Sequence, residues 1–162
     1  YYSFLFFMLH RFGKILLSRD FDSSQLEPLT LGISKWFLTH ILSFPFATIR
    51  LRKAVKVTES IFQKYDVILC PVLASKTVKN GTLLDPELPF DVVLERIRQY
   101  APFTALQNIT GEPAISLPLG MSQDGLPIGV QFAAPMGHDK VLLELSFELE
   151  HAKPWPQFPI IK

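Results

Sequence analysis

The feature that most constrains the fold is a pair of short apolar segments separated by a glycine turn. The segments cover residues 113–120 and 128–134, and the polar residues between them are centred on Asp124 and Gly125. Because glycine adopts positive φ without steric cost, Asp-Gly between two apolar runs predicts a β-hairpin. Residues 140–150 then carry apolar side chains at helical spacing. The sequence therefore predicts strand, turn, strand and helix in that order.

The remaining elements follow from apolar periodicity and from the residues that interrupt it. Helices are predicted over residues 2–18, 31–44, 47–65, 90–100 and 101–110. Pro45 is expected to separate the second helix from the third, because proline lacks a backbone donor. A strand is predicted over residues 67–70, and its unbroken apolar run favours cover on both faces. Together with strands at 114–119 and 128–134, these elements indicate an α/β fold: a partial mixed sheet of about three strands covered by helices.

The length of 162 residues favours a single domain over residues 1–162. Within it we expect a mainly helical part (1–65), then strand, loop, helix, β-hairpin and helix (66–150). Three prolines favour an extended tail over residues 151–162. Three strands are few for a stable open sheet, and the chain starts with Tyr1 rather than methionine. We therefore expect a piece of a larger protein.

Composition narrows the possible partners and the compartment. The net charge of +1 gives no reason to expect nucleic acid or an anionic membrane as partner. The apolar start, residues 1–9, is too short to span a membrane, which takes about 20 apolar residues. A single cysteine, Cys70, excludes an intramolecular disulfide and favours a reducing, cytoplasmic location. Since Cys70 ends an apolar run, we interpret it as a buried, inert thiol.

Three groups of residues resemble the C-terminal portion of the amidase-signature hydrolases. They are Asn108-x-Thr110-Gly111-x-Pro113-Ala114-Ile115-Ser116-x-Pro118-x-Gly120, then Asp124-Gly125-Leu126-Pro127-Ile128-Gly129-Val130-Gln131, and upstream Tyr65-Asp66-Val67-Ile68-Leu69-Cys70-Pro71. The chain departs from the family at Glu112, where many members carry a small or apolar residue, and at Cys70, where threonine is commoner. The resemblance implies the C-terminal piece of the amidase-signature fold.

The resemblance also implies a reaction, hydrolysis of a carboxamide C–N bond by a Ser–cis-Ser–Lys mechanism. The family's two serines lie in a glycine- and serine-rich segment upstream of these motifs, whereas no two of the eight glycines in this chain are adjacent. We therefore predict no catalytic residue in this chain and no activity of the chain alone. Motifs for metal binding are absent from the sequence, and neither a metal nor a cofactor is expected.

Substrate contact is the remaining role that the resemblance suggests. It implies that Thr104 and Asn108 face a small-molecule amide in the full-length enzyme. The structural alternative places Thr104 on a helix face and has Asn108 bond backbone ahead of the turn at Gly111. Gln131 is the one polar residue of its strand, so it needs partners if buried, and a structural bond is the favoured interpretation.

Two other functions stay open. The chain is alternatively a non-catalytic interaction module, or part of an amidotransferase-type subunit that passes ammonia to a partner. A truncated sheet leaves an unpaired edge and apolar surface, so we also expect the isolated chain to self-associate, with residues 1–12 contributing to the contact.

Overall fold

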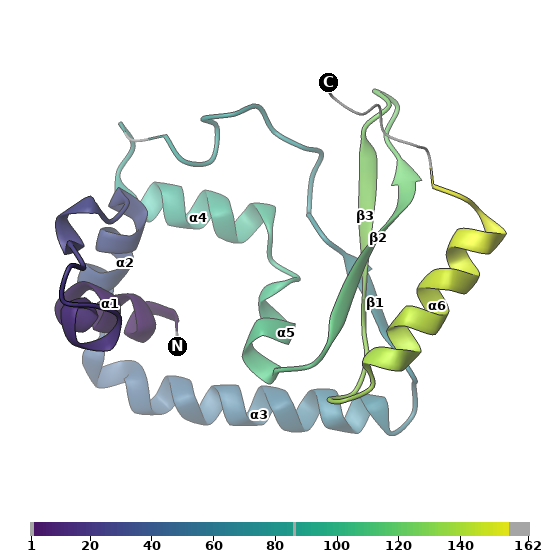
Figure 1. Cartoon of the computed structure of the whole chain (residues 1–162), viewed down its shortest axis with the longest axis horizontal. Helices are drawn as coiled ribbons and strands as arrows, with labels where there is room; N and C mark the ends of the chain where they lie inside the picture. Colours follow the sequence, from purple (N-terminus) through teal and green to yellow (C-terminus); the bar gives the residue numbers. More distant parts are fainter. Residues whose placement is uncertain (1, 86, 156–162) are drawn as a thin grey trace. The chain divides into compact units, whose positions relative to one another are not determined.

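The computed structural model describes residues 2–85 and 87–155 (Figure 1). The chain divides into two compact units. The first comprises Tyr1–Lys53 and Val78–Arg98, and the second comprises Ala54–Thr77 and Gln99–Lys162. The single domain expected over residues 1–162 stays a prediction.

The first unit is helical and is organised around phenylalanine rings. It contains α1 (Tyr2–Leu16), α2 (Pro28–Thr39), the short helices η1 (Ser23–Gln25) and η2 (Ile41–Ser43), and most of α4 (Phe90–Tyr100). Phe37 of α2 is buried. The ring centroids of Phe4 and Phe7 lie 5.6 and 5.2 Å from that of Phe37, within the range of favourable aromatic pairs. The apolar start of the chain therefore packs against α2.

Helix α3 (Phe44–Phe62) corrects the predicted break at Pro45. The helix begins one residue before Pro45, which places the proline in the first turn. A backbone N–H has no helical partner there, so its absence costs nothing. Thr58 on this helix is buried, whereas Tyr65, the last residue of the predicted helix, lies beyond the observed end and is exposed.

The second unit contains a three-stranded sheet of β1 (Ile68–Pro71), β2 (Ala114–Met121) and β3 (Pro127–Ala133), in the order β1-β3-β2. The predicted α/β class with about three strands is confirmed. The predicted mixed sheet is corrected, because both pairings are antiparallel. The register of β2 against β3 shifts between Leu117 and Gly120, at Pro118, which has no N–H to donate.

The predicted hairpin between β2 and β3 is confirmed. Gly125 has φ +76°, in the region that favours glycine, and its N–H donates to the carbonyl of Ser122 over 3.0 Å. The N–H of Ser122 in turn donates to the carbonyl of Leu126 over 2.8 Å. These two bonds close the turn that the Asp-Gly pair predicted.

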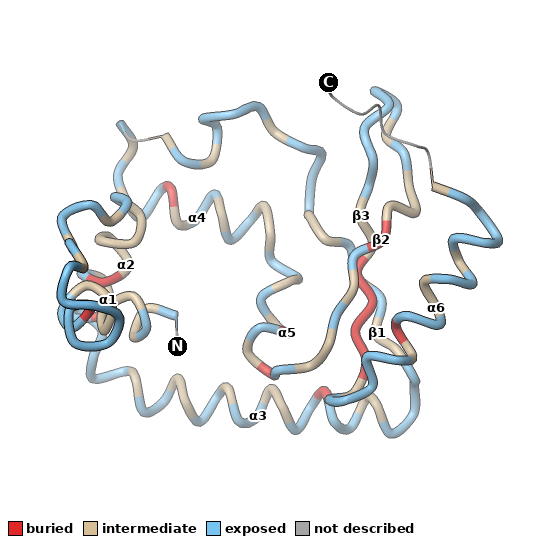
Figure 2. Tube along the Cα trace, in the orientation of Figure 1, coloured by how far each residue is buried: buried red, intermediate tan, exposed pale blue. Residues whose placement is uncertain are grey.

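Helix α6 (Asp139–Ala152) covers one face of the sheet, and the short helix α5 (Ala105–Thr110) lies on the other side (Figure 1). The core between sheet and α6 contains Leu117, Phe132 and Leu142. Figure 2 shows buried residues concentrated along the sheet of this unit. The last residues of the predicted tail, 156–162, lie outside the described residues.

Strand β1 corrects the prediction that both of its faces are covered. Burial alternates along the strand, and Leu69 has 61% of its surface exposed. The reason is position, since β1 is an edge strand of this sheet. Over residues 2–85 and 87–155, no helix combines the length and the hydropathy needed to cross a membrane.

Candidate functional site

A row of three polar side chains crosses the sheet on the face that α6 leaves free. Gln131 on β3 is the register partner of Cys70 on β1 and of Ser116 on β2. Opposed residues of antiparallel strands share a face, and successive residues alternate between faces. The row therefore lies opposite Leu117 and Phe132, which pack in the core under α6. It presents a thiol, a carboxamide and a hydroxyl side by side.

Gln131 joins this row to α5. Its Nε2 donates to Oε1 of Gln107 over 2.8 Å and approaches Sγ of Cys70 at 3.6 Å. Gln107 and Gln131 are only 6% and 7% exposed. A buried carboxamide without a partner is costly, and here the Nε2 of Gln131 is a donor for the Oε1 of Gln107. The structural bond predicted for Gln131 is confirmed.

Gln107 is the residue that sequence reasoning missed. It lies in a helix of six residues, too short for a 3.6-residue period to show which side faces inward. The single available signal was indirect: a lone polar residue in the apolar strand β3 requires a polar partner somewhere in the fold.

Cys70 is half-buried rather than buried. Desolvation raises the pKa of its thiol, and the N–H of Gln131 opposes that rise in pKa by favouring the thiolate. A raised pKa leaves less thiolate, the reactive form, near neutral pH. The prediction of a buried, inert thiol is therefore refined: Cys70 is partly accessible, and its raised pKa lowers its reactivity as a nucleophile.

We expect Cys70 to react more slowly with iodoacetamide in the folded chain than in urea at pH 8, because its raised pKa reduces the thiolate fraction. The alkylation rate should rise with pH, and its midpoint should lie above that of the unfolded chain. Mass spectrometry gives both rates without ambiguity, since the chain has one cysteine. Equal rates at pH 8, with circular dichroism showing a folded chain, would contradict the expectation.

The two residues predicted to contact substrate lie one helical turn apart in α5. Thr104 is half-buried at the N-cap position, and its side chain makes no capping hydrogen bond. Asn108 is exposed, and its Nδ2 donates to the carbonyl of Thr104 over 3.5 Å. Residues four apart share a helix face, so both side chains lie on one side of α5. Their contact with substrate stays a prediction.

Gly111 ends α5 with a left-handed C-cap. Its φ is +79°, and its N–H donates to the carbonyl of Gln107 over 2.8 Å. A side chain is disfavoured in this conformation, which explains why the turn uses glycine. The buried pair Gln107–Gln131 thus links α5 to β3, and Gly111 ends the helix just before the chain enters β2.

A hollow of about 210 Å³ adjoins the polar row. It is lined by residues 72–77 and 126–129, and by Ser122. Gly129 lies two residues from Gln131 on the same face of β3. A Cβ atom at position 129 would lie 3.0 Å from Cγ2 of Val72 and 3.1 Å from Oγ of Ser116. Glycine at this position therefore lets Val72 and Ser116 pack closely on the strand, where a Cβ atom would crowd both.

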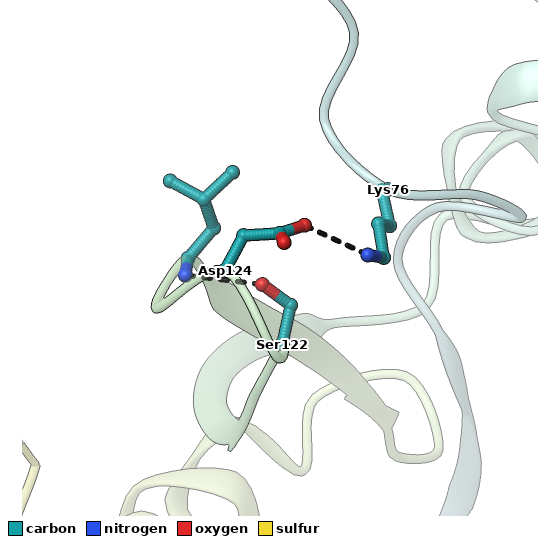
Figure 3. A network of polar contacts seen from close by, with 4 residues as sticks. Lys76, Ser122 and Asp124 are labelled. Atoms are coloured by element: carbon teal, nitrogen blue, oxygen red, sulfur yellow. Dashed lines mark hydrogen bonds and ion pairs between the residues drawn. The ribbon is translucent and has the colours of Figure 1, made fainter.

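An ion pair joins the hairpin turn to the segment beside the hollow (Figure 3). Nζ of Lys76 lies 2.7 Å from Oδ2 of Asp124, and Oγ of Ser122 accepts the N–H of Leu126 over 3.1 Å. Both charged side chains are largely exposed, and such pairs contribute about 0–1 kcal/mol. We interpret the pair as orienting the turn rather than stabilising the unit.

The part of the chain that the structure describes contains no candidate metal-binding cluster. No three His, Cys, Asp or Glu side chains there are placed to hold a metal ion. His10 bonds Ser34 inside the first unit over 2.9 Å, and His138 contacts the carbonyl of Met136 over 3.2 Å before α6. The groups that the sheet itself offers are the hydrogen-bonding side chains of Cys70, Gln131 and Ser116.

Comparison with known proteins shows which protein family this chain resembles. The family model described as Amidase matches residues 38–143. The protein AmiC of Mycobacterium leprae, provisionally named an amidase, is 41% identical over 160 residues, 99% of this chain and 34% of AmiC. A glutamyl-tRNA(Gln) amidotransferase subunit of Thermodesulfovibrio yellowstonii is 32% identical over 145 residues, 85% of this chain and 27% of that protein.

A solved structure shares the fold. The structure of 6-aminohexanoate cyclic dimer hydrolase complexed with substrate matches with a TM-score of 0.74 and 28% identity, over 94% of this chain and 33% of that one. The chain thus spans about a third of the length of the proteins it matches. The family model covers well over half of the chain, from the end of α2 to the start of α6. The chain belongs to the amidase family.

Proposed function

We propose that this chain is the C-terminal portion of an amidase that hydrolyses a carboxamide C–N bond. The observation that carries the proposal is the alignment of nearly the whole chain with about a third of AmiC. The fold shared with a cyclic-dimer amide hydrolase supports the same reaction class. The substrate is a small-molecule amide.

The reacting groups in this proposal lie outside the chain. Amide hydrolysis needs a nucleophile, a base and oxyanion donors. The family resemblance assigns these roles to a Ser–cis-Ser–Lys triad, whose two serines lie in a glycine- and serine-rich segment that this sequence does not contain. The chain contributes a wall of the substrate site, from which α5 presents Thr104 and Asn108. By itself the chain is inactive.

The test compares three proteins: the longer protein read from the coding sequence upstream of Tyr1, the same protein with its upstream nucleophilic serine replaced by alanine, and this 162-residue chain. Each is given aliphatic amides, aryl amides and the 6-aminohexanoate cyclic dimer, and the released acid is quantified by chromatography. We expect turnover by the first protein only, with a loss of at least about 10³-fold in the serine variant.

Two outcomes would overturn the proposal. Turnover by the 162-residue chain itself would contradict its inactivity. An upstream sequence without a Gly-Gly-Ser-Ser-Gly-Gly-Ser-like segment would favour the non-catalytic interaction module instead.

A second function is favoured by the match to an amidotransferase subunit. In that case the longer protein would release ammonia from glutamine and pass it to a partner. Glutamine hydrolysis that depends on an added partner protein, without turnover of simple amides, would identify this role.

A further inference from the structure

We propose that Gln107 and Gln131 are positioning residues for amide hydrolysis. Their buried hydrogen bond holds α5 against the sheet, so that Thr104 and Asn108 face the substrate. This inference rests on the proposed function. It assigns a role in the reaction to two residues that contact no reacting atom and that act by positioning α5.

Helix α5 is too short to hold its own position. It has six residues, whereas isolated helices shorter than about 12–15 residues are marginal in water. Its N-terminal end lacks a side-chain cap, because Thr104 makes no capping bond. Of the two residues proposed to contact substrate, Thr104 therefore lies at the uncapped end of the helix, and Asn108 lies one turn further along.

The attachment of α5 to the sheet includes one polar, directional contact. Gln107 and Thr110 are the buried residues of the helix, and the hydroxyl of Thr110 donates to Leu106 of α5 itself over 3.1 Å. The side chain of Gln107 instead accepts from Gln131, which belongs to another element. A hydrogen bond restricts both length and angle, whereas an apolar contact tolerates sliding.

The anchor residue is itself fixed. Gln131 lies in the central strand of the sheet, paired with Cys70 on one side and Ser116 on the other. Its Nε2 approaches Sγ of Cys70 as well as Oε1 of Gln107. This hydrogen bond therefore links α5 to the central strand of the sheet. Gln107 lies between Thr104 and Asn108 in sequence, so a shift of Gln107 would move both residues. Small displacements of substrate-positioning groups are costly, since about 1 Å can lower a rate by about 10²-fold.

The experiment uses Gln131→Met and Gln107→Met, which keep side-chain length and remove the hydrogen bond. Gln107→Glu keeps an acceptor for Gln131, and Gln123→Met changes an exposed glutamine of the hairpin turn as the matched control. In the longer protein we measure kcat and KM for an amide. Labelling of the nucleophilic serine by a fluorophosphonate probe reports whether the catalytic groups stay intact. In the 162-residue chain, hydrogen exchange of residues 104–111 reports the order of α5.

We expect each methionine variant to lower kcat/KM by about 10-fold or more through a raised KM, with unchanged serine labelling. Exchange across α5 should accelerate in the same variants, while Gln107→Glu recovers most of the loss and Gln123→Met matches the wild type. A purely structural role would lower labelling and turnover together, in proportion to unfolded protein, and would overturn the inference.

Two failures are distinguishable. If the wild-type longer protein hydrolyses amides and the methionine variants equal the Gln123→Met control, the positioning role is wrong while the proposed function stands. If the wild-type protein neither labels nor turns over, the proposed function fails and the positioning role fails with it. If hydrogen exchange across α5 is unchanged in Gln131→Met, the hydrogen bond does not hold α5 in place, and the inference is wrong whatever the activity.

Discussion

Replacing Phe132 by alanine is expected to destabilise the second unit by about 3–5 kcal/mol. Phe132 is 5% exposed and belongs to the core cluster with Leu117, Ala134 and Leu142. Removing the ring loses its burial and leaves a cavity that close-packed neighbours fill incompletely. Because small domains have about 5–15 kcal/mol of stability, this single change should remove a large fraction of the total.

Urea denaturation followed by Trp155 fluorescence measures this loss, because Trp155 packs against the same cluster. A Trp36→Phe background removes the signal of the first unit. Phe147→Ala is the matched control, since Phe147 on α6 is 69% exposed, and we expect a change within about 0.5 kcal/mol. Equal urea midpoints for the two alanine variants would show that the core lies elsewhere.

Leu142→Ala is expected to destabilise the same unit by about 2–5 kcal/mol. Leu142 lies on the face of α6 that packs on the sheet and is 3% exposed, whereas the adjacent Leu143 is 53% exposed. Both substitutions change leucine to alanine within one helix, so their effects on helix propensity are similar.

The difference between the two variants therefore isolates packing of α6 on the sheet. Leu143→Ala should change the free energy of unfolding by no more than about 0.5 kcal/mol in the same urea experiment. A larger loss at Leu143 than at Leu142 would mean that α6 packs through its other face, and would refute the described arrangement.

The parts of the fold that depend on local chemistry were predictable. Asp124-Gly125 predicted the hairpin because the turn needs a residue with positive φ, and the glycine has it. The parts that depend on neighbours were not. The run at residues 67–70 does not reveal that β1 is an edge strand, and Pro45 reads as a break although it stands in a helical first turn, where it is tolerated.

The candidate site was predictable only in part, for a similar reason. Gln131 stands out as a polar residue within an apolar strand, so its need for a partner follows from the sequence. The identity of that partner depends on how α5 meets the sheet, which no periodicity in six residues encodes. Thr104 and Asn108 came from the family resemblance, and their contact with substrate awaits the kinetic test.

Pro118 in β2 bears on how molecules of this protein would aggregate. Templated growth of a cross-β fibril requires each new strand to find consecutive backbone donors along the strand already present. In β2, Pro118 lacks its N–H where the register against β3 also shifts. The longest outer strand of this sheet is thus a poor template, and β1 offers only four residues. Self-association of the isolated chain, which stays a prediction, would then proceed through apolar side chains and give amorphous assemblies rather than ordered fibrils.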